Sequence, residues 1–247
     1  MRDVLGYRAR LGVVVPSTNT IMEPELAALA PPGVTIHGAR LRVARPALGT
    51  AAEARAFIEG VRAALAGAVA DVATAEPDRV LVGISVLSFM GGVAGHRELK
   101  DALGATTAIG VTTAAEAATA ALQVLGVRRL GLLSPHPPLF DAHYTRFFAE
   151  SGYEVVTLHR LAAASALAIA ALDEATIRPA LRALADAGVE AIVQVGTDLA
   201  MVRLADEAER WLGLAVLAVN AALLWHALRA CGVADQLRGA GMLLREH

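Results

Sequence analysis

Short runs of β-branched residues alternate along the chain with longer segments in which alanine, leucine and arginine recur at helical spacing. This alternation is typical of parallel strands joined by crossover helices, and it predicts an α/β fold. We expect strands at Arg10–Val15, Val34–Leu41, Arg79–Gly83, Thr106–Ile109, Arg129–Leu133, Glu154–Leu158, Ala191–Gln194 and Ala215–Ala218. We expect helices at Glu53–Ala73, Ala114–Leu125, Leu139–Ser151, Thr176–Ala187, Leu204–Leu212 and Ala221–Cys231.

The predicted strands occur in the same order in two halves of the chain. Four pairs of short runs are related: LGVVVP with LGLLSP, VTIH with VTLH, RVLVGIS with EAIVQVGT, and IGVTTAA with LAVNAAL. Four echoes in one order indicate an internal duplication. We therefore predict two pseudo-symmetric, Rossmann-like lobes of four parallel strands at residues 1–110 and 111–220. A C-terminal helix and tail at 221–247 would pack back on the lobes.

The duplication predicts where a ligand binds. In open parallel sheets the ligand lies beyond the carboxyl ends of the strands. Two facing lobes would enclose a cleft that is lined by equivalent loops from each half. These loops are 16–20 with 135–138, 84–89 with 195–201, and 111–113 with 219–221.

The expected cleft loops are rich in neutral hydrogen-bond donors, contain no lysine or arginine, and carry a single formal charge, on Asp198. Such donors, with the N–H groups of helix starts, suit a small carboxylate. Each side chain taken singly is also an ordinary helix cap, but their clustering on one side of a duplicated sheet favours a ligand site. The donors are Ser17, Thr18, Asn19, Thr20, Ser85, Ser88, Thr112, Thr113, His136, Thr197 and Asn220.

Composition narrows the class of protein and partner. The chain has 247 residues, of which 55% are hydrophobic, so it is long enough to bury a sizeable core. A formal net charge of −2, with acids and bases mixed, gives no reason to expect nucleic acid or a membrane as a partner. No apolar run reaches the roughly 20 residues of a bilayer span. The charged start MRDVLGYRAR does not resemble a signal peptide, so we expect a cytoplasmic protein.

Other motifs give no metal or phosphate site. Cys231 is the single cysteine, which excludes an intrachain disulfide and a thiolate metal cluster. HPPLFDAHY contains His136, Asp141 and His143, but two prolines break the helical spacing of a metal site, so we expect no metal. GISVLSFMGG lacks the glycine spacing and the lysine of a phosphate loop.

Three long segments resemble a known family. LGVVVPSTNTIMEPEL, VLVGISVLSFMGG and AIVQVGTDLAMVRLADEAERWLGLAVLAVNAALLWHAL are similar to the aspartate/glutamate racemase superfamily, in the branch of maleate cis–trans isomerase, arylmalonate decarboxylase and the ectoine-utilisation protein A group. The resemblance covers nearly the whole chain. It implies a two-lobed enzyme without a cofactor that holds a small mono- or dicarboxylate between its lobes. Typical members carry a cysteine after the third strand of each lobe, which moves a proton or adds to a double bond.

This chain departs from the family pattern at both cysteine positions. The first falls on Ile84 or Ser85, and the second on Gly196 or Thr197, while Cys231 matches neither. A hydroxyl is a far weaker acid than a thiol, so the usual cysteine chemistry is not expected here. The family's substrate-binding tyrosine is replaced by His136. The expected catalytic residues are Ser85, Thr197, His136 and Asp198; the expected substrate-binding residues are Ser17, Thr18, Asn19, Ile84, Val86, Thr112, Thr113, Gly196 and Asn220.

Three functional hypotheses follow. The first is an isomerase, racemase or decarboxylase in which His136, titrating near neutrality, or Asp198, raised in pKa by burial, carries the proton. The second is a non-catalytic carboxylate-binding protein in a catabolic pathway. The third is a structural role, with Phe89 and Met90 filling the cleft. A homodimer is the expected assembly, because two-fold oligomers are the commonest.

Overall fold

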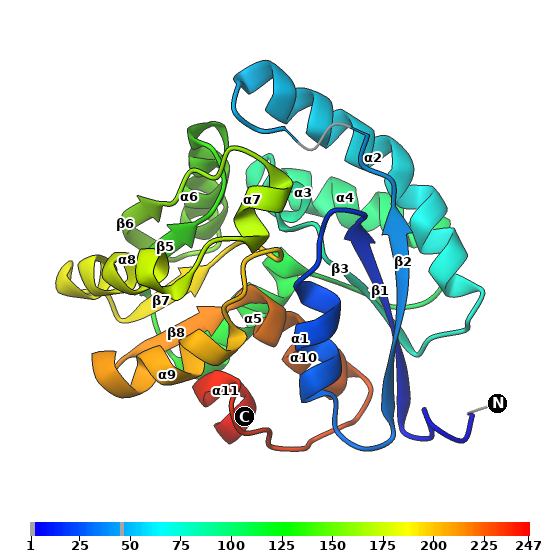
Figure 1. Ribbon diagram of the computed structural model, residues 1–247. Helices are drawn as coiled ribbons and strands as arrows, with labels where there is room; N and C mark the ends of the chain where they lie inside the picture. The colour runs from blue at the N-terminus through cyan, green and yellow to red at the C-terminus, as the bar shows by residue number, and fades with distance from the viewer. Residues whose placement is uncertain (1–2, 45–46) are drawn as a thin grey trace.

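The computed structural model describes residues 3–44 and 47–247, which form two sheets of four parallel strands each (Figure 1). The first sheet has the order β2-β1-β3-β4, and the second has the order β6-β5-β7-β8. This shared order confirms the predicted α/β fold with two duplicated sheets. The strands are β1 (Ala9–Pro16), β2 (Val34–Leu41), β3 (Arg79–Val82), β4 (Val111–Thr113), β5 (Arg129–Ser134), β6 (Glu154–Arg160), β7 (Ala191–Gln194) and β8 (Ala215–Ala218).

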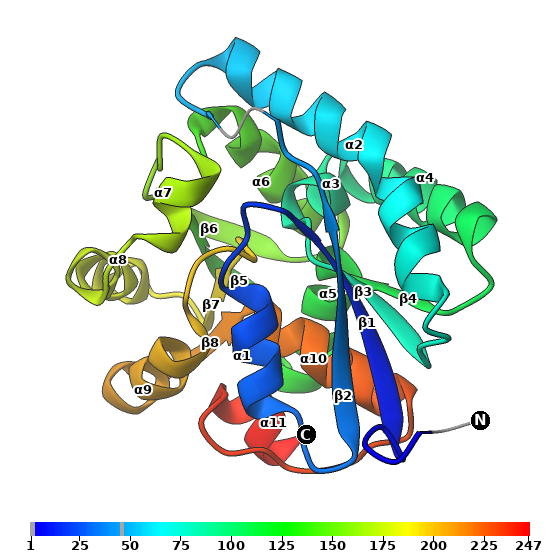
Figure 2. The ribbon, with the colours of Figure 1, turned by 45° about the vertical axis from the view of Figure 1, so that its right-hand side comes forward.

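Helices cover the sheets and join the strands. The longest, α2, packs along β1 and β2 and extends beside α4, as Figure 2 shows. No helix in the described part of the chain is long and apolar enough to cross a lipid bilayer. The helices are α1 (Met22–Leu29), α2 (Ala51–Ala73), α3 (Ser85–Phe89), α4 (Gly92–Thr106), α5 (Ala114–Leu125), α6 (Asp141–Glu150, after the 3-10 turn Pro138–Phe140), α7 (Ala166–Ala170), α8 (Glu174–Asp186), α9 (Val202–Leu212), α10 (Val219–Ala230) and α11 (Gly241–Glu246).

The edge strand of the first sheet is not where the sequence pattern placed it. We expected a strand at Thr106–Ile109, but Thr106 is the last residue of α4 and its hydroxyl donates back to Ala102 O at 3.1 Å. The strand is β4, in which Val111 pairs with Val80 of β3. β-branched residues occupy both segments, so pattern alone does not distinguish them. The helices α1, α3, α4 and α7 were also not among those predicted.

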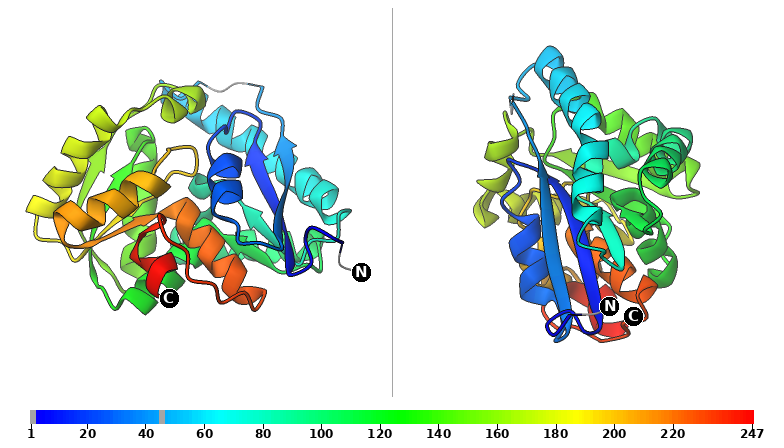
Figure 3. Two further views of the ribbon diagram at one scale, coloured as in Figure 1. Left: turned by 60° about the horizontal axis from the view of Figure 1, so that its bottom comes forward. Right: turned by 90° about the vertical axis from the view of Figure 1, so that its right-hand side faces the viewer.

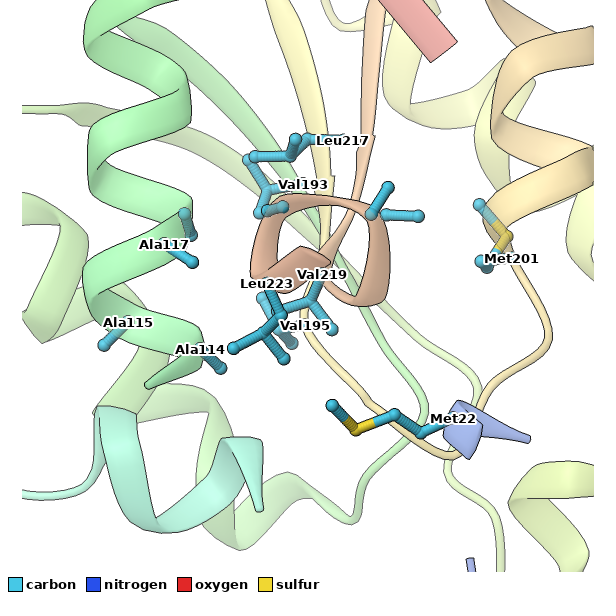
Figure 4. Packing of buried hydrophobic residues seen from close by; sticks show 14 of the residues in the cluster. Met22, Ala114, Ala115, Ala117, Val193, Val195, Met201, Leu217, Val219 and Leu223 are labelled. Carbon is cyan, nitrogen blue, oxygen red and sulfur yellow. The ribbon is translucent and has the colours of Figure 1, made fainter. Parts of the chain in front are cut away.

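The two halves interlock through helices that follow their last strands. α5 follows β4 and α10 follows β8, and the two helices pack against each other between the sheets (Figure 3). α10 also packs on β3 and β4 of the first sheet. Figure 4 shows Ala114 and Ala117 of α5 facing α10, which carries Val219 and Leu223. Alanines here allow the helix axes to approach closely, so the halves share one continuous core.

An aromatic cluster joins α3 of the first half to α6 of the second. Phe89 is fully buried, and its ring centroid lies 5.4 Å from Tyr144, 5.1 Å from Phe147 and 5.4 Å from Phe148. Such aromatic pairs stabilise by roughly 0.5–1.5 kcal/mol each beyond the area they bury. The cluster therefore fixes the first half against the second at the C-terminal end of α3.

Candidate active site

A small cavity lies where the carboxyl ends of the strands of both halves meet. It has a volume of about 40 Å³, room for a few waters, so a carboxylate with a substituent would bind only if the lining side chains moved apart. Phe89 and Met90, expected to fill the cleft if the role were structural, are outside its lining. Leu48 N donates to Ala164 O at 2.9 Å, so the halves also touch beside it. The lining residues are Pro16, Thr18, Asn19, Leu48, Phe57, Gly83, Ile84, Ser85, Val86, His136, Ala166, Ile169, Thr197 and Asp198.

Asn19 both supports the start of α1 and is a candidate ligand donor. Its Oδ1 accepts from Ile21 N at 3.0 Å and from Met22 N at 2.9 Å, which satisfies the N–H groups of the residue before α1 and of its first residue. Its Nδ2 is buried and has no hydrogen-bond partner among the described residues, and the same holds for Thr18 Oγ1. An unsatisfied buried polar group costs roughly 1–3 kcal/mol. These two groups of the lining are therefore available to a ligand.

Ser85 and Thr197 occupy matching positions in the two halves but differ in hydrogen bonding. The hydroxyl of Thr197 donates to Gly83 O at 2.9 Å, which commits its proton to a bond between the halves. No described residue hydrogen bonds to the hydroxyl of Ser85, which is buried at the start of α3. Gly83 is tightly packed, because a Cβ there would lie 2.3 Å from Met22 Sδ. Ser85 is thus the hydroxyl that a ligand can engage.

His136 is a neutral side chain, which corrects the expectation that it titrates near neutrality. It is buried, and burial lowers its pKa to about 3. Its Nδ1 lies 2.7 Å from the hydroxyl of the fully buried Tyr144, whose only hydrogen-bond partner in the described chain is this nitrogen. If the tyrosine O–H donates to Nδ1, the proton of the neutral ring is on Nε2. His136 then provides an uncharged donor.

Asp198 is the charged residue of the lining, and its environment favours the protonated form. It is 9% exposed, and burial raises its pKa to about 7. The N–H of Thr20, which donates to Asp198 Oδ1 at 3.1 Å, and the charge of Arg40 oppose this rise. Near neutral pH both the acid and the carboxylate are populated, which suits a group that gives and takes protons.

Asn220 lies behind the cavity and not in its lining. Its Nδ2 donates to Thr197 O at 3.0 Å and to Glu25 Oε2 at 2.7 Å. Glu25 Oε1 accepts from Met201 N and Val202 N, both at 3.0 Å, at the start of α9. Burial raises the pKa of Glu25, and these hydrogen bonds oppose the rise. Glu25 and Asn220 therefore hold the segment from Thr197 to Val202. Glu25 was not predicted as a functional residue, and the only sign of it in the sequence is that it is the second acid of MEPEL.

Thr112 and Thr113 also lie outside the lining, although both were expected at the cleft. Thr112 Oγ1 accepts from Arg79 Nε at 2.7 Å and lies 3.1 Å from His226 Nδ1. Thr113 is the N-cap of α5 and forms a capping box with Glu116. β4 is an edge strand, so its end lies away from the centre where the loops of β1, β3, β5 and β7 meet.

Ser17 and Gly196 are the other two expected substrate-binding residues that the structure does not bring to the cavity lining. The hydroxyl of Ser17 accepts from Val43 N at 3.0 Å and is exposed. Gly196 O accepts from Gln194 Nε2 at 2.5 Å, and a Cβ on Gly196 would lie 2.4 Å from Pro135. Gly196 therefore shapes the loop on which Thr197 and Asp198 are carried.

The described residues contain no group of three or more histidine, cysteine, aspartate or glutamate side chains that could hold a metal ion. In HPPLFDAHY, His136 contacts Tyr144, Asp141 pairs with Arg160, and His143 accepts from Gly91 N at 3.4 Å. Cys231 follows the last residue of α10 and is not in the cavity lining.

Comparisons with known proteins agree with this architecture. A sequence model of the arylmalonate decarboxylase family matches residues 11–244. A maleate isomerase from Nocardia farcinica is 26% identical over 252 residues, which cover 98% of this chain and 97% of that protein.

Solved structures show the same fold. A serine variant of the Nocardia farcinica maleate cis–trans isomerase, with a covalently bound succinylcysteine intermediate, has a TM-score of 0.88 at 24% identity and covers 96% of this chain and 98% of its own. A double mutant of arylmalonate decarboxylase in its liganded form has a TM-score of 0.83 at 25% identity, covering 96% and 99%. Since the family model spans almost all of the chain, this protein belongs to the arylmalonate decarboxylase family, in the maleate isomerase and arylmalonate decarboxylase branch of the aspartate/glutamate racemase superfamily.

Proposed function

We propose that this protein is a cofactor-independent enzyme that binds a small carboxylate between its lobes and moves a proton at the carbon beside that carboxylate, as an isomerase, racemase or decarboxylase. One observation carries the proposal. Two buried groups without a hydrogen-bond partner among the described residues, Asn19 Nδ2 and Thr18 Oγ1, belong to residues that line the same small cavity as Asp198, whose pKa is about 7. The cavity thus combines groups for gripping an anion with a group for proton transfer.

The relatives support carboxylate chemistry but not the same proton carrier. The solved maleate isomerase variant holds a succinylcysteine, so that enzyme forms a bond through a cysteine. Among the described lining residues of this chain there is no cysteine. Thr197 has its proton engaged by Gly83 O, and the hydroxyl of Ser85 is a far weaker acid than a thiol. Asp198 remains as the group that can donate or accept a proton near neutral pH.

The proposed step is a proton transfer between the substrate carbon and Asp198. When the proton is removed, the electron pair of the C–H bond moves into an enediolate and the proton goes to the Asp198 carboxylate. In the reverse step, the protonated Asp198 returns a proton to the carbon. In a decarboxylation, loss of CO₂ generates the same enediolate and Asp198 protonates it. Asn19, Ser85 and the neutral His136 would donate to the enediolate oxygens, and stabilising such charge is often the largest catalytic contribution.

A non-catalytic carboxylate-binding protein is the second candidate. The observation in its favour is the lack of a thiol among the described lining residues, together with the engaged hydroxyl of Thr197. Such a protein would use the same donors and would need no proton carrier.

Proton exchange at the carbon beside the carboxylate separates the two candidates. A panel of small carboxylates would be incubated with the protein in deuterated water, and deuterium uptake would be followed by mass spectrometry, with binding measured by calorimetry. We expect exchange that Asp198→Asn slows by about 10²–10⁴-fold. The matched control, Asp186→Asn, removes an exposed carboxylate at the end of α8 and should exchange at the wild-type rate. Binding without exchange would identify a binding protein, and no binding of any carboxylate would overturn both candidates.

A further inference from the structure

Asp198 faces the space in which a ligand carboxylate would lie, and no cation is beside it in the described lining. Among the described residues, the one hydrogen-bond donor to Asp198 is Thr20 N. His136, across the cavity, is uncharged near neutral pH because its pKa is about 3. The guanidinium of Arg40, on β2, pairs with Glu23 and donates to Ser17 O, so it acts on Asp198 only from a distance.

The carboxylate of Glu25 approaches the same loop from the other side. It is bound to Met201 N, Val202 N and Asn220 Nδ2, which occupy both of its oxygens. Glu25 is an acid, so it cannot balance the charge of a second anion near Asp198.

Two carboxylates in one small buried cavity cannot both remain ionised, because like charges at close range destabilise each other strongly in a medium of low polarity. Ligand binding must then bring in one proton, which is shared between the two carboxyl groups. An O–H···O⁻ bond of this kind is shorter and stronger than a neutral hydrogen bond. We infer that the site recognises its ligand as a carboxylate plus one proton, with Asp198 donating to the ligand carboxylate that Asn19 and Thr18 hold.

The remaining lining indicates the rest of the ligand. Leu48, Phe57 and Ile169 supply apolar surface, as do Ile84 and Val86. No charged donor accompanies them in the described lining, so a second ionised carboxylate would lose its hydration without compensation. The inferred ligand class is a small acid with one ionised carboxylate and an apolar substituent. This inference rests on the proposed function in taking the ligand to be a carboxylate. The shared proton must move onto the ligand carboxylate before the Asp198 carboxylate can take a proton from the carbon, and the preference for one ionised carboxylate favours an isomerase or racemase over a decarboxylase, whose substrate carries two carboxyl groups.

Calorimetry on the wild-type protein tests the shared proton directly. Isobutyrate is the monocarboxylate probe and maleate the dicarboxylate probe, each titrated between pH 6 and pH 9 in buffers of different ionisation enthalpy. Above the pKa of Asp198 we expect uptake of about one proton per isobutyrate and a Kd that rises about tenfold per pH unit. At pH 8 maleate should bind at least about tenfold more weakly than isobutyrate, since its second charge has no donor.

A variant then assigns the proton to Asp198. Asp198→Asn keeps an N–H donor at this position, so isobutyrate should still bind, without proton uptake and with a Kd that is independent of pH. Asp186→Asn should behave as the wild type. Isobutyrate binding to the wild type without proton uptake, or maleate binding as tightly as isobutyrate at pH 8, would overturn the inference and leave the proposed function standing. If no carboxylate binds at any pH, the proposed function fails as well.

Discussion

The two halves share one scaffold but supply different chemistry. The β1–β3 pairing begins at Leu11 and Arg79, and the β5–β7 pairing begins at Leu130 and Ala191. Counting forward from these residues in each half, we obtain the equivalent loop positions. Ser85 matches Thr197, Ser17 matches His136, and Val86 matches Asp198.

This difference separates holding an anion from moving a proton. The first half supplies the groups that have no partner in the described part of the chain, Asn19 Nδ2 and Thr18 Oγ1. The second half supplies both titratable side chains of the described lining, His136 and Asp198. A duplicated fold provides two sets of loops at one cavity, and here the first set carries unpaired neutral donors while the second carries the ionisable groups of the described lining.

The largest expected effect concerns the two ionisable groups, which change stability with pH in opposite directions. Burial lowers the pKa of His136 from 6.5 to about 3, so the unfolded chain binds a proton that the folded chain refuses, and stability is lost as the pH falls through this range. Burial raises the pKa of Asp198 from 3.8 to about 7, so the folded chain keeps a proton that the unfolded chain releases, and stability is lost as the pH rises through that range.

The two effects should offset each other in the wild type between about pH 4 and pH 6.5, and each substitution should expose the other. Relative to wild type, Asp198→Asn should gain, and His136→Gln should lose, about 1 kcal/mol of unfolding free energy per pH unit as the pH rises through this window. Urea unfolding at a series of pH values measures both. Stability curves that run parallel to the wild-type curve would contradict the assignment.

The next effect separates the two roles of Asn19. Asn19→Asp keeps an oxygen for Ile21 N and Met22 N, so α1 should remain capped, but it removes the donor and adds a negative charge. Carboxylate binding should weaken by at least about tenfold, because a hydrogen bond to a charged group contributes roughly 1.5–3 kcal/mol. Calorimetry with isobutyrate measures the loss.

A different cap provides the control for Asn19. Asp173→Ala removes the N-cap of α8, which is outside the cavity. It should lower stability by about 1 kcal/mol and leave the Kd unchanged. Equal effects of the two substitutions on binding would mean that Asn19 acts only as a cap.

The sequence predicted the sheets well because their signal is local. Buried parallel strands are short continuous apolar runs, and seven of the eight expected strands overlap the observed ones. The exception, Thr106–Ile109, shows the limit, since only pairing with β3 distinguishes the edge strand from the end of α4. The alignment of IGVTTAA with LAVNAAL was wrong because strand pairing, and not the local pattern, determines which residues are equivalent. In register, Val111 pairs with Val80 and Val216 pairs with Ile192, so Val111 matches Val216 and not Val219.

The cavity was predictable where a residue directly follows a central strand, as Ser85, His136 and Thr197 do. It was not predictable where the chain returns from a distance, as Leu48, Phe57 and Ile169 do, because no local pattern marks those contacts. The mistaken alignment of the two halves explains why Asn220 was expected in the cavity. It was aligned with Thr112 at the end of β4, but its equivalent in the first half is Ala115 in the first turn of α5. Its true partner, Glu25, comes from α1, a helix that the pattern did not predict.

A smaller effect is expected from the hydrogen bond between Glu25 of the first half and Asn220 of the second half. It has no symmetric counterpart, because the strand register makes Ala115 the equivalent of Asn220. Glu25→Gln sets two N–H donors against each other, and Asn220→Asp sets two carboxylates against each other. Each single substitution should cost roughly 1–3 kcal/mol of unfolding free energy. The double variant restores the hydrogen bond between positions 25 and 220 with donor and acceptor exchanged, but not the bond to Thr197 O. It should therefore recover part of the loss, as measured by urea unfolding. If stability did not recover, the loss in the single variants would not be due to this hydrogen bond.

The smallest effect is expected at Cys231. It tests whether the thiol of the single cysteine takes part in the reaction. The residue lies at the C-cap of α10, where its N–H donates to Ala227 O at 3.0 Å and to Leu228 O at 3.1 Å, and it is outside the cavity lining. These bonds use the backbone, so Cys231→Ala should keep them and the end of α10 should stay intact. Turnover of any substrate found in the exchange assay should stay within about twofold of wild type, and a thiol-alkylating reagent should not inhibit either protein. Inhibition of the wild type that is lost in Cys231→Ala would place the thiol in the reaction and would remove the reason for assigning the proton to Asp198.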